Sequence, residues 1–196
     1  MKNYIKEQIK ESYELKKNIY EDDNLLEEIK KLSQLCIKIY RNGNKTILAG
    51  NGGSAADAQH IAAELVGRYG FDRDSLPSLA LTTDTSNLTA IGNDYGFDKI
   101  YSRQLDGMGQ SGDVFIGIST SGNSQNLINA FKIAKKKNII SVALVGKDGG
   151  AMAELADIVL IVPSNSTPRI QESHILIGHI LCDIIEKELF ANGVHN

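Results

Sequence analysis

The sequence lacks the features by which membrane and secreted proteins are recognised. It contains no apolar run of about 18 residues, the length at which a membrane helix is suspected. Residues 1–17 are polar and contain no apolar signal core. The formal net charge of -3 gives no overall basic field that would favour nucleic acid as a partner. We therefore expect a cytoplasmic protein that binds neither membranes nor nucleic acid.

Cysteine is also scarce. The two cysteines, Cys36 and Cys182, both lie in apolar helical patterns. The chain has no CxxC motif and no cysteine spacing that would indicate a disulfide framework. We therefore expect two buried free thiols, which fits a reducing compartment.

From residue 45 onward, short apolar runs alternate with helical patterns. The apolar runs rich in β-branched residues are 46–49, 77–81, 113–118, 139–145 and 158–162. The helical segments between and after them are 54–69, 85–107 (interrupted near Gly96), 124–137, 151–156 and 168–190. Near-continuous apolar strands that alternate with helices are typical of a parallel sheet covered on both faces. The pattern predicts an α/β three-layer sandwich with a five-stranded parallel sheet flanked by helices.

Two amphipathic helices, at residues 1–20 and 24–42, precede this alternation. No low-complexity linker interrupts the chain, so we expect a single domain over residues 1–196. In this interpretation residues 1–42 form an N-terminal helical extension for packing or oligomerisation, and residues 45–190 form the α/β core.

Ligands of such folds bind at the carboxyl ends of the strands. The first such loop, residues 50–54 (GNGGS), leads directly into a helix, whose free N–H groups favour an anion. Ser54 is a good N-cap, and Asp57 completes a variant of the capping box. The loop also fits the dinucleotide fingerprint GxGxxA, but no acidic residue ends the second strand, which disfavours a dinucleotide enzyme.

The third loop, residues 119–124 (STSGNS), is dense in hydroxyl groups and precedes another helix. Such a loop can surround phosphate oxygens with neutral donors. A plain capped loop is the alternative, because serine and asparagine are common in turns. The Walker pattern GxxxxGK[ST] is absent, which disfavours hydrolysis of nucleoside triphosphates.

His60 and Glu64 lie four residues apart and share one helix face. They could form a surface ion pair, provide two ligands of one metal, or include a general base. In the last helix, His179 follows Gly178, which allows close approach of another element. Gln171 lies eight residues before His179, about 12 Å along a helix, so the two could meet one ion only at a frayed helix start or with a second subunit.

Six motifs can be compared with known families as a set. They are GNGGS (50–54), HxxxELxGRY (60–69), GNDxGF (92–97), GDVxxGISTSGNS (112–124), VGKDGG (145–150) and RIQExHxxxxH (169–179). Together they resemble the sugar-isomerase (SIS) domain family and, within it, the phosphoheptose isomerases. The resemblance covers essentially the whole chain, although Ala55 and Ala56 stand where some relatives carry larger polar residues.

The resemblance implies a set of site residues. Those expected to line the sugar or phosphate are Asn51, Gly52, Gly53, Ser54, Asn93, Asp94, Ser119, Thr120, Ser121, Ser124 and Gln171. The implied ligands of one zinc ion per subunit are His60, Glu64, Gln171 and His179. Glu64 and His179 would also be the acid/base pair, and the family forms homotetramers whose sites are shared between subunits.

The implied activity is that of an aldose–ketose isomerase. It would convert D-sedoheptulose 7-phosphate to D-glycero-D-manno-heptose 7-phosphate through an enediol, the first step of nucleotide-activated heptose biosynthesis for lipopolysaccharide or capsule. A similar SIS protein that binds the bacterial replication initiator suggests an alternative, a non-catalytic scaffold or sugar-phosphate sensor. That relative lacks equivalents of Glu64 and of the second histidine, both of which are present here, so the enzyme is favoured.

Overall fold

The structure, a computed structural model, describes residues 1–191 of the chain. The strands are β1 (Thr46–Gly50), β2 (Ser78–Ala80), β3 (Val114–Ser119), β4 (Ile140–Gly146) and β5 (Ile158–Val162). The helices are α1 (Lys2–Glu21), α2 (Asp23–Arg41), α3 (Gly53–Val66), α4 (Thr85–Tyr95), the short 3-10 helix η1 (Phe97–Lys99), α5 (Ile100–Met108), α6 (Gln125–Lys136), α7 (Gly150–Ala153) and α8 (Thr167–Phe190).

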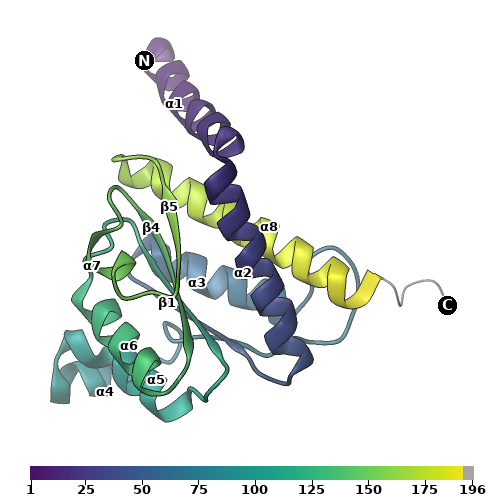
Figure 1. Ribbon diagram of the computed structural model, residues 1–196. Coiled ribbons are helices and arrows are strands. Elements are labelled where there is room, and N and C mark those ends of the chain that lie inside the picture. Colours follow the sequence, from purple (N-terminus) through teal and green to yellow (C-terminus); the bar gives the residue numbers. More distant parts are fainter. Residues whose placement is uncertain (192–196) are drawn as a thin grey trace.

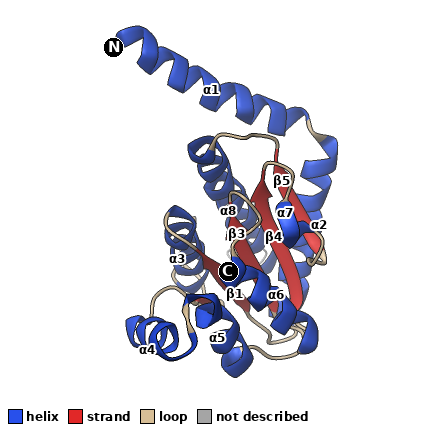
Figure 2. Cartoon of the chain, turned by 90° about the vertical axis from the view of Figure 1, so that its left-hand side faces the viewer, coloured by secondary structure: helices blue, strands red, loops and turns tan. Residues whose placement is uncertain are grey.

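The five strands form one parallel sheet in the order β2-β1-β3-β4-β5. Helices α2, α3 and α8 cover one face of the sheet, and α5, α6 and α7 cover the other (Figures 1 and 2). The predicted α/β three-layer sandwich is therefore confirmed. The predicted strand limits agree with the observed ones to within one residue at each end.

The apolar strands supply two cores, one on each face of the sheet. Successive side chains of a strand point to opposite faces. Ile116 and Leu144 therefore pack under α2, α3 and α8, whereas Phe115 and Val145 pack under the helices of the opposite face. A sheet buried on both faces explains why its strands read as continuous apolar runs instead of alternating with polar residues.

The strand order changes direction between β1 and β3. From β1 the chain crosses to β2 on one side, and from β3 it crosses to β4 on the other. Ligands of open parallel sheets bind at such a switch point, above the carboxyl ends of the two strands. The loops that follow β1 and β3 are the two that the sequence analysis identified as anion-binding candidates, so both open toward the same place.

Helices α3 and α8 pack closely against each other, and glycine permits this at two positions. A Cβ atom on Gly53 would lie 2.5 Å from the amide nitrogen of Gln171. A Cβ on Gly178 would lie 2.5 Å from the side chain of Ile61. The close approach predicted at Gly178 is thus confirmed, and the element that approaches is α3.

Helix α1 extends away from the sandwich in both views (Figures 1 and 2). Of its apolar stripe only Leu15 and Ile19, near its junction with α2, are buried. The stripe continues toward the amino end with Ile5 and Ile9, which are more than half exposed at 51% and 60%. Among residues 1–191 the outer half of α1 therefore has no apolar partner.

The structure corrects one local prediction. Helix α3 begins at Gly53 with Gly52 as its N-cap, and no side chain caps it. Ser54 lies inside the first turn, so the capping box assigned to Ser54 and Asp57 is wrong.

Other predictions about segments of the chain agree with the structure. The predicted interruption at Gly96 is confirmed, because Gly96 separates α4 from η1. Cys36 and Cys182 are free and buried, as predicted. Burial raises the pKa of Cys182 to about 12. Among residues 1–191, no helix is long and apolar enough to cross a membrane.

Candidate active site

A cavity of about 100 Å³ lies at the switch point between β1 and β3. A cavity of this volume has room for a small anion such as a phosphate group. Its lining residues come from the two candidate loops, the end of β3, the start of α3 and the amino-terminal part of α8. They are Asn51, Ser54, Ile118, Ser119, Thr120, Ser121, Ser124 and Gln171.

In the loop of residues 119–124, the hydroxyl groups of Ser119 and Ser124 make few hydrogen bonds to other groups of the chain. Ser124 is the N-cap of α6, but its side chain accepts no hydrogen bond from the helix. Its Oγ lies 3.3 Å from Oγ of Ser119, and the Gly122 N–H donates to Ser119 Oγ at 3.2 Å. Because helix N–H groups and hydroxyls meet here without a positive side chain in the lining, the cavity suits a phosphate group held by neutral donors.

The first loop is held in place by Asn51. Its side-chain amide exchanges two hydrogen bonds with the amide of Asn126 on α6, at 3.0 and 2.9 Å. Tyr101 on α5 donates to the carbonyl of Gly50 just before it, and burial raises the pKa of Tyr101 to about 12. Asn51 thus uses its side chain to hold the first loop against α6. Sequence reasoning missed both Asn126 and Tyr101.

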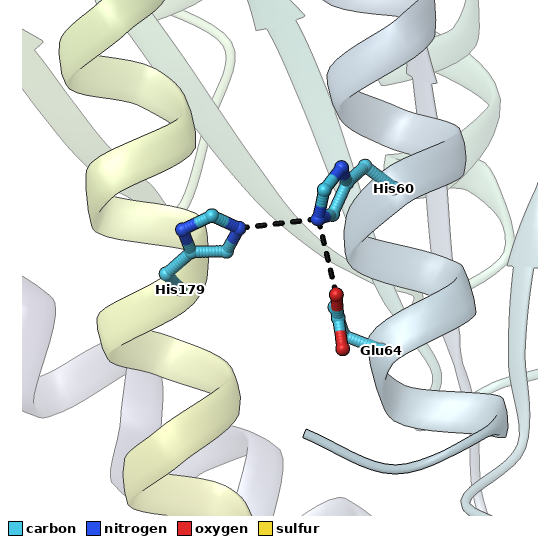
Figure 3. Close-up of side chains that lie close together, drawn as sticks. All are labelled: His60, Glu64 and His179. Carbon is cyan, nitrogen blue, oxygen red and sulfur yellow. Dashed lines mark hydrogen bonds and ion pairs between the residues drawn. The ribbon is translucent and has the colours of Figure 1, made fainter. Parts of the chain in front are cut away.

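His60, Glu64 and His179 come together beside the sheet, between α3 and α8 (Figure 3). The Nε2 atom of His60 lies 3.1 Å from Glu64 Oε1 and 3.2 Å from His179 Nε2. Two helices therefore supply the cluster, with His60 and Glu64 one turn apart on α3 and His179 opposite them on α8. The His60 side chain is 49% exposed and that of Glu64 27% exposed, so the cluster is open to an incoming ligand.

The geometry of this cluster fits a metal ion. One ligand atom from each of His60, Glu64 and His179 lies within 4.8 Å of the other two. In a tetrahedral zinc site with Zn–N distances near 2.0–2.1 Å, two histidine nitrogens are about 3.3 Å apart, close to the 3.2 Å observed. A bis-histidine, single-carboxylate set is also one that zinc accepts in catalytic sites.

Gln171 lies apart from this cluster within the chain. It packs against Gly53 at the amino end of α3 and lines the anion cavity. His60 is seven residues further along α3, about 10 Å at ~1.5 Å per residue. The structure therefore brings together three of the four metal ligands that the resemblance implies, and it places Gln171 with the residues that face the anion.

Asn93 and Asp94 also lie apart from the cavity and the cluster. They are exposed on α4, where the Asn93 amide donates to Asp94 Oδ1 at 2.8 Å. Asp94 lines a separate groove of about 350 Å³ together with Tyr95 and Arg103. The described residues of one chain do not bring these two side chains to the predicted sugar site.

Asp57 is a half-buried carboxylate near the cluster whose role sequence reasoning misread. It lies on α3 one turn before His60, and its Oδ2 atom is buried without a hydrogen-bond partner among the described residues. Burial raises the pKa of Asp57 to about 6, and nearby His60 opposes that rise. The only sequence signal was its spacing from Ser54, which pointed to a helix cap.

Comparisons with known proteins agree with this geometry. The sequence model of the SIS domain family matches residues 8–146. The chain is 74% identical over 195 residues to the phosphoheptose isomerase of Sulfurimonas denitrificans, which covers 100% of each chain. It is 58% identical over 193 residues to phosphoheptose isomerase 2 of Campylobacter jejuni, with 98% of this chain and 96% of the relative covered.

A solved structure gives the same result. The phosphoheptose isomerase of Neisseria gonorrhoeae has a TM-score of 0.89 to this chain at 44% identity, with 95% of this chain and 98% of the other covered. Identity and coverage of this order show the family as well as the fold. The chain belongs to the SIS domain family and, within it, to the phosphoheptose isomerases.

Proposed function

We propose that this chain interconverts D-sedoheptulose 7-phosphate and D-glycero-D-manno-heptose 7-phosphate by aldose–ketose isomerisation through an enediol. The observation that carries the proposal is the convergence of His60, Glu64 and His179 on α3 and α8, the two helices whose amino-terminal parts also line the anion cavity. An isomerase needs both parts, one to hold the phosphate and one to move protons at the other end of the sugar.

The spacing of the two parts matches the length of a heptose phosphate. Gly53 lies beside the cavity residue Gln171, and His60 follows seven residues later on α3, about 10 Å along the helix. An extended chain advances about 1.2 Å per bond, so a heptose 7-phosphate spans roughly 10 Å from phosphorus to C1. A phosphate held by Ser119, Thr120, Ser121 and Ser124 would therefore place C1 and C2 at the cluster.

We assign Glu64 as the base that takes the carbon-bound proton, and His179 as the acid and base that exchanges protons with the two oxygens. Their separate helices let them approach opposite ends of the C1–C2 unit, with His60 between them. The backbone of Asn51, Gly52 and Gly53, with Ser54 and Gln171, would contact the sugar.

The same cluster would hold one zinc ion through His60, Glu64 and His179. When bound, the ion would supply Lewis-acid polarisation of the substrate carbonyl. Gln171 would join as a fourth ligand only through movement of α8 or through a second subunit. Glu64 is thus proposed both as a ligand of the ion and as the base, and it would not perform these two roles at the same time.

We further propose a homotetramer whose sites are shared between subunits. The support is that the outer half of the α1 apolar stripe has no partner among residues 1–191 and that Asn93 and Asp94 lie away from the site of their own chain. Mixing inactive Glu64→Gln and Asp94→Asn subunits should then restore some activity, because some sites would combine an intact Glu64 with an intact Asp94. If the mixture stays inactive at every ratio, Asp94 acts in the same chain as Glu64; if Asp94→Asn is active by itself, Asp94 has no role.

The decisive assay is turnover of sedoheptulose 7-phosphate by the purified chain, with and without added zinc. Glu64→Gln should keep the fold and the binding of substrate but lower kcat by at least about 100-fold, as expected for the loss of a general base. Glu28→Gln, which removes a surface carboxylate paired with Lys31 on α2, is the matched control. Full activity of Glu64→Gln would refute the assignment, and a wild-type chain without turnover would favour a non-catalytic sugar-phosphate-binding protein.

A further inference from the structure

Glu186, on α8, is a buried carboxylate that the proposed reaction does not use. It is 1% exposed and accepts four hydrogen bonds. Three come from consecutive backbone N–H groups, those of Tyr69 at 2.7 Å, Gly70 at 2.5 Å and Phe71 at 3.2 Å. The fourth comes from Nε of Arg73 at 3.0 Å, and the Arg73 side chain is itself only 2% exposed. We propose that Glu186 and Arg73 are positioning residues, which hold Glu64 and His179 in register across α3 and α8.

Arg73 acts on the carboxyl end of α3. Its guanidinium donates to the carbonyls of Glu64 at 2.9 Å, Leu65 at 2.8 Å and Gly67 at 3.2 Å. The last carbonyls of a helix have no partner inside the helix, and the fork of a guanidinium can satisfy several at once. Arg73 therefore fixes the backbone of the residue assigned as the base, and Glu186 fixes Arg73 to α8.

The same carboxylate also fixes a side chain next to His179. The loop whose N–H groups bind Glu186 begins with Tyr69, and the Tyr69 ring lies 5.8 Å from the His179 ring between centroids. Glu186 is seven residues beyond His179, two helical turns along the same side of α8. One buried group thus contacts both the end of α3 that carries Glu64 and the loop that packs on His179.

The charge of Glu186 is maintained by its donors. Burial alone would raise the pKa of Glu186, but the backbone N–H groups of Tyr69, Gly70 and Phe71 and the side chain of Arg73 together lower it below the ordinary range. A buried ion pair is a poor source of stability compared with apolar packing of similar volume. Its use here is consistent with a requirement for fixed geometry, as found for the hydrogen-bonded groups behind metal ligands.

The chain offers a matched control in Asp113. Asp113 is also 1% exposed and accepts from Lys45 Nζ at 2.6 Å and from the backbone N–H groups of Lys45 and Gln110 at 3.1 and 2.9 Å. It precedes β3, at the amino edge of the sheet, and its partners Asn44, Lys45 and Gln110 belong to neither α3 nor α8. Loss of its charge removes a similar buried network without touching α3 or α8.

This inference rests on the proposed function, and the experiment separates the two. Wild type, Glu186→Gln, Arg73→Lys and Asp113→Asn are compared as full chains at a temperature where circular dichroism shows each to be folded. The measurements are kcat and KM for sedoheptulose 7-phosphate, and zinc affinity by competition with a chromogenic chelator. Arg73→Lys keeps a charge for Glu186 but lacks the fork that reaches the carbonyls of Glu64 and Leu65.

Glu186→Gln and Arg73→Lys should each lower kcat at least about tenfold and weaken zinc binding about 10–100-fold, the range seen when groups behind metal ligands are changed. KM should change less than kcat, because the phosphate cavity lies at the other end of α3. Asp113→Asn should keep all three parameters within about twofold of wild type.

The inference is overturned if the two folded variants match wild type, or if Asp113→Asn loses as much as they do. It is also overturned if neither variant folds, because the pair would then be needed for folding itself. If only Glu186→Gln fails to fold, the kcat and the zinc affinity of Arg73→Lys decide whether the inference holds. A wild-type chain that binds zinc without turnover refutes the proposed isomerase, while the comparison of zinc affinities still decides the role of Glu186.

Discussion

His174 should make the folded chain sensitive to acid. This histidine is fully buried on α8, where its Nε2 lies 3.1 Å from the carbonyl oxygen of Val145 at the end of β4. Its other nitrogen, Nδ1, has no partner among the described residues. The neutral ring can donate one hydrogen bond from Nε2, but a charged ring would carry a second buried N–H group without an acceptor. Burial therefore lowers the pKa of His174 to about 4, although the bond to Val145 opposes this shift.

The sign and size of the effect follow from linkage. In the unfolded chain a histidine titrates near 6.5, so as the pH falls the unfolded state takes up the proton first and gains stability relative to the folded state. The loss begins near pH 6.5 and is complete below pH 4. With these two values, the free energy of unfolding should fall by about 1.4 kcal/mol between pH 7.5 and 5.5, and by about 2.5 kcal/mol between pH 7.5 and 4.5.

A difference measurement isolates this group from the others. His174→Gln can keep the donor to Val145 without titrating. Urea unfolding of wild type and variant is followed by circular dichroism at four pH values from 7.5 to 4.5, at one fixed protein concentration because association shifts apparent stability. Asp57 contributes with the opposite sign, since its pKa is raised to about 6 and its stabilisation is lost as the pH rises, but it is common to both proteins. A wild-type minus variant difference that stays constant within about 0.5 kcal/mol over this range would refute the buried neutral histidine.

Two further predictions concern the ends of the site. Ser124→Ala should raise KM about tenfold or more with a smaller change in kcat, because one hydroxyl donor to a charged phosphate is lost. The control is Ser111→Ala, in the turn before β3. If both substitutions raise KM equally, Ser124 does not contact the phosphate. Gly178→Ala should lower the free energy of unfolding by about 1–3 kcal/mol in urea titrations, because its Cβ would lie 2.5 Å from the Ile61 side chain. An unchanged midpoint would show that α3 and α8 can separate without cost.

The features whose positions sequence reasoning anticipated are those encoded locally. The strands were identified because both faces of the sheet are covered, which makes each strand a continuous apolar run. The loops after β1 and β3 were expected at one edge because the carboxyl ends of parallel strands share it. His60 and Glu64 were paired through helical spacing alone. Each of these inferences needed only a few neighbouring residues.

The parts that were missed depend on contacts between distant segments. The position of Gln171 required knowing that α8 packs its first turn against Gly53, and sequence spacing alone left open a meeting with His179 at a frayed helix start. The Arg73–Glu186 pair joins residues 113 positions apart, and neither belongs to a motif by which it would be noticed. The N-cap of α3 was misplaced by two residues, because Ser54 has the chemistry of an N-cap while the backbone turns at Gly52.

Successive parts of α3 therefore have different roles in the site. Its amino end lies at the anion cavity, its third and fourth turns carry His60 and Glu64, and its carboxyl end is bound to α8 through Arg73. Because the helix is rigid, the seven residues from Gly53 to His60 set a separation of about 10 Å between the phosphate and the reacting carbons. This separation is kept only if the helix cannot slide or tilt. The helix must be held firmly because a misplacement of about 1 Å can lower the rate roughly 100-fold. The buried anchor at the far end of α3 therefore belongs with the catalytic geometry, although it touches neither the substrate nor a metal ligand's side chain.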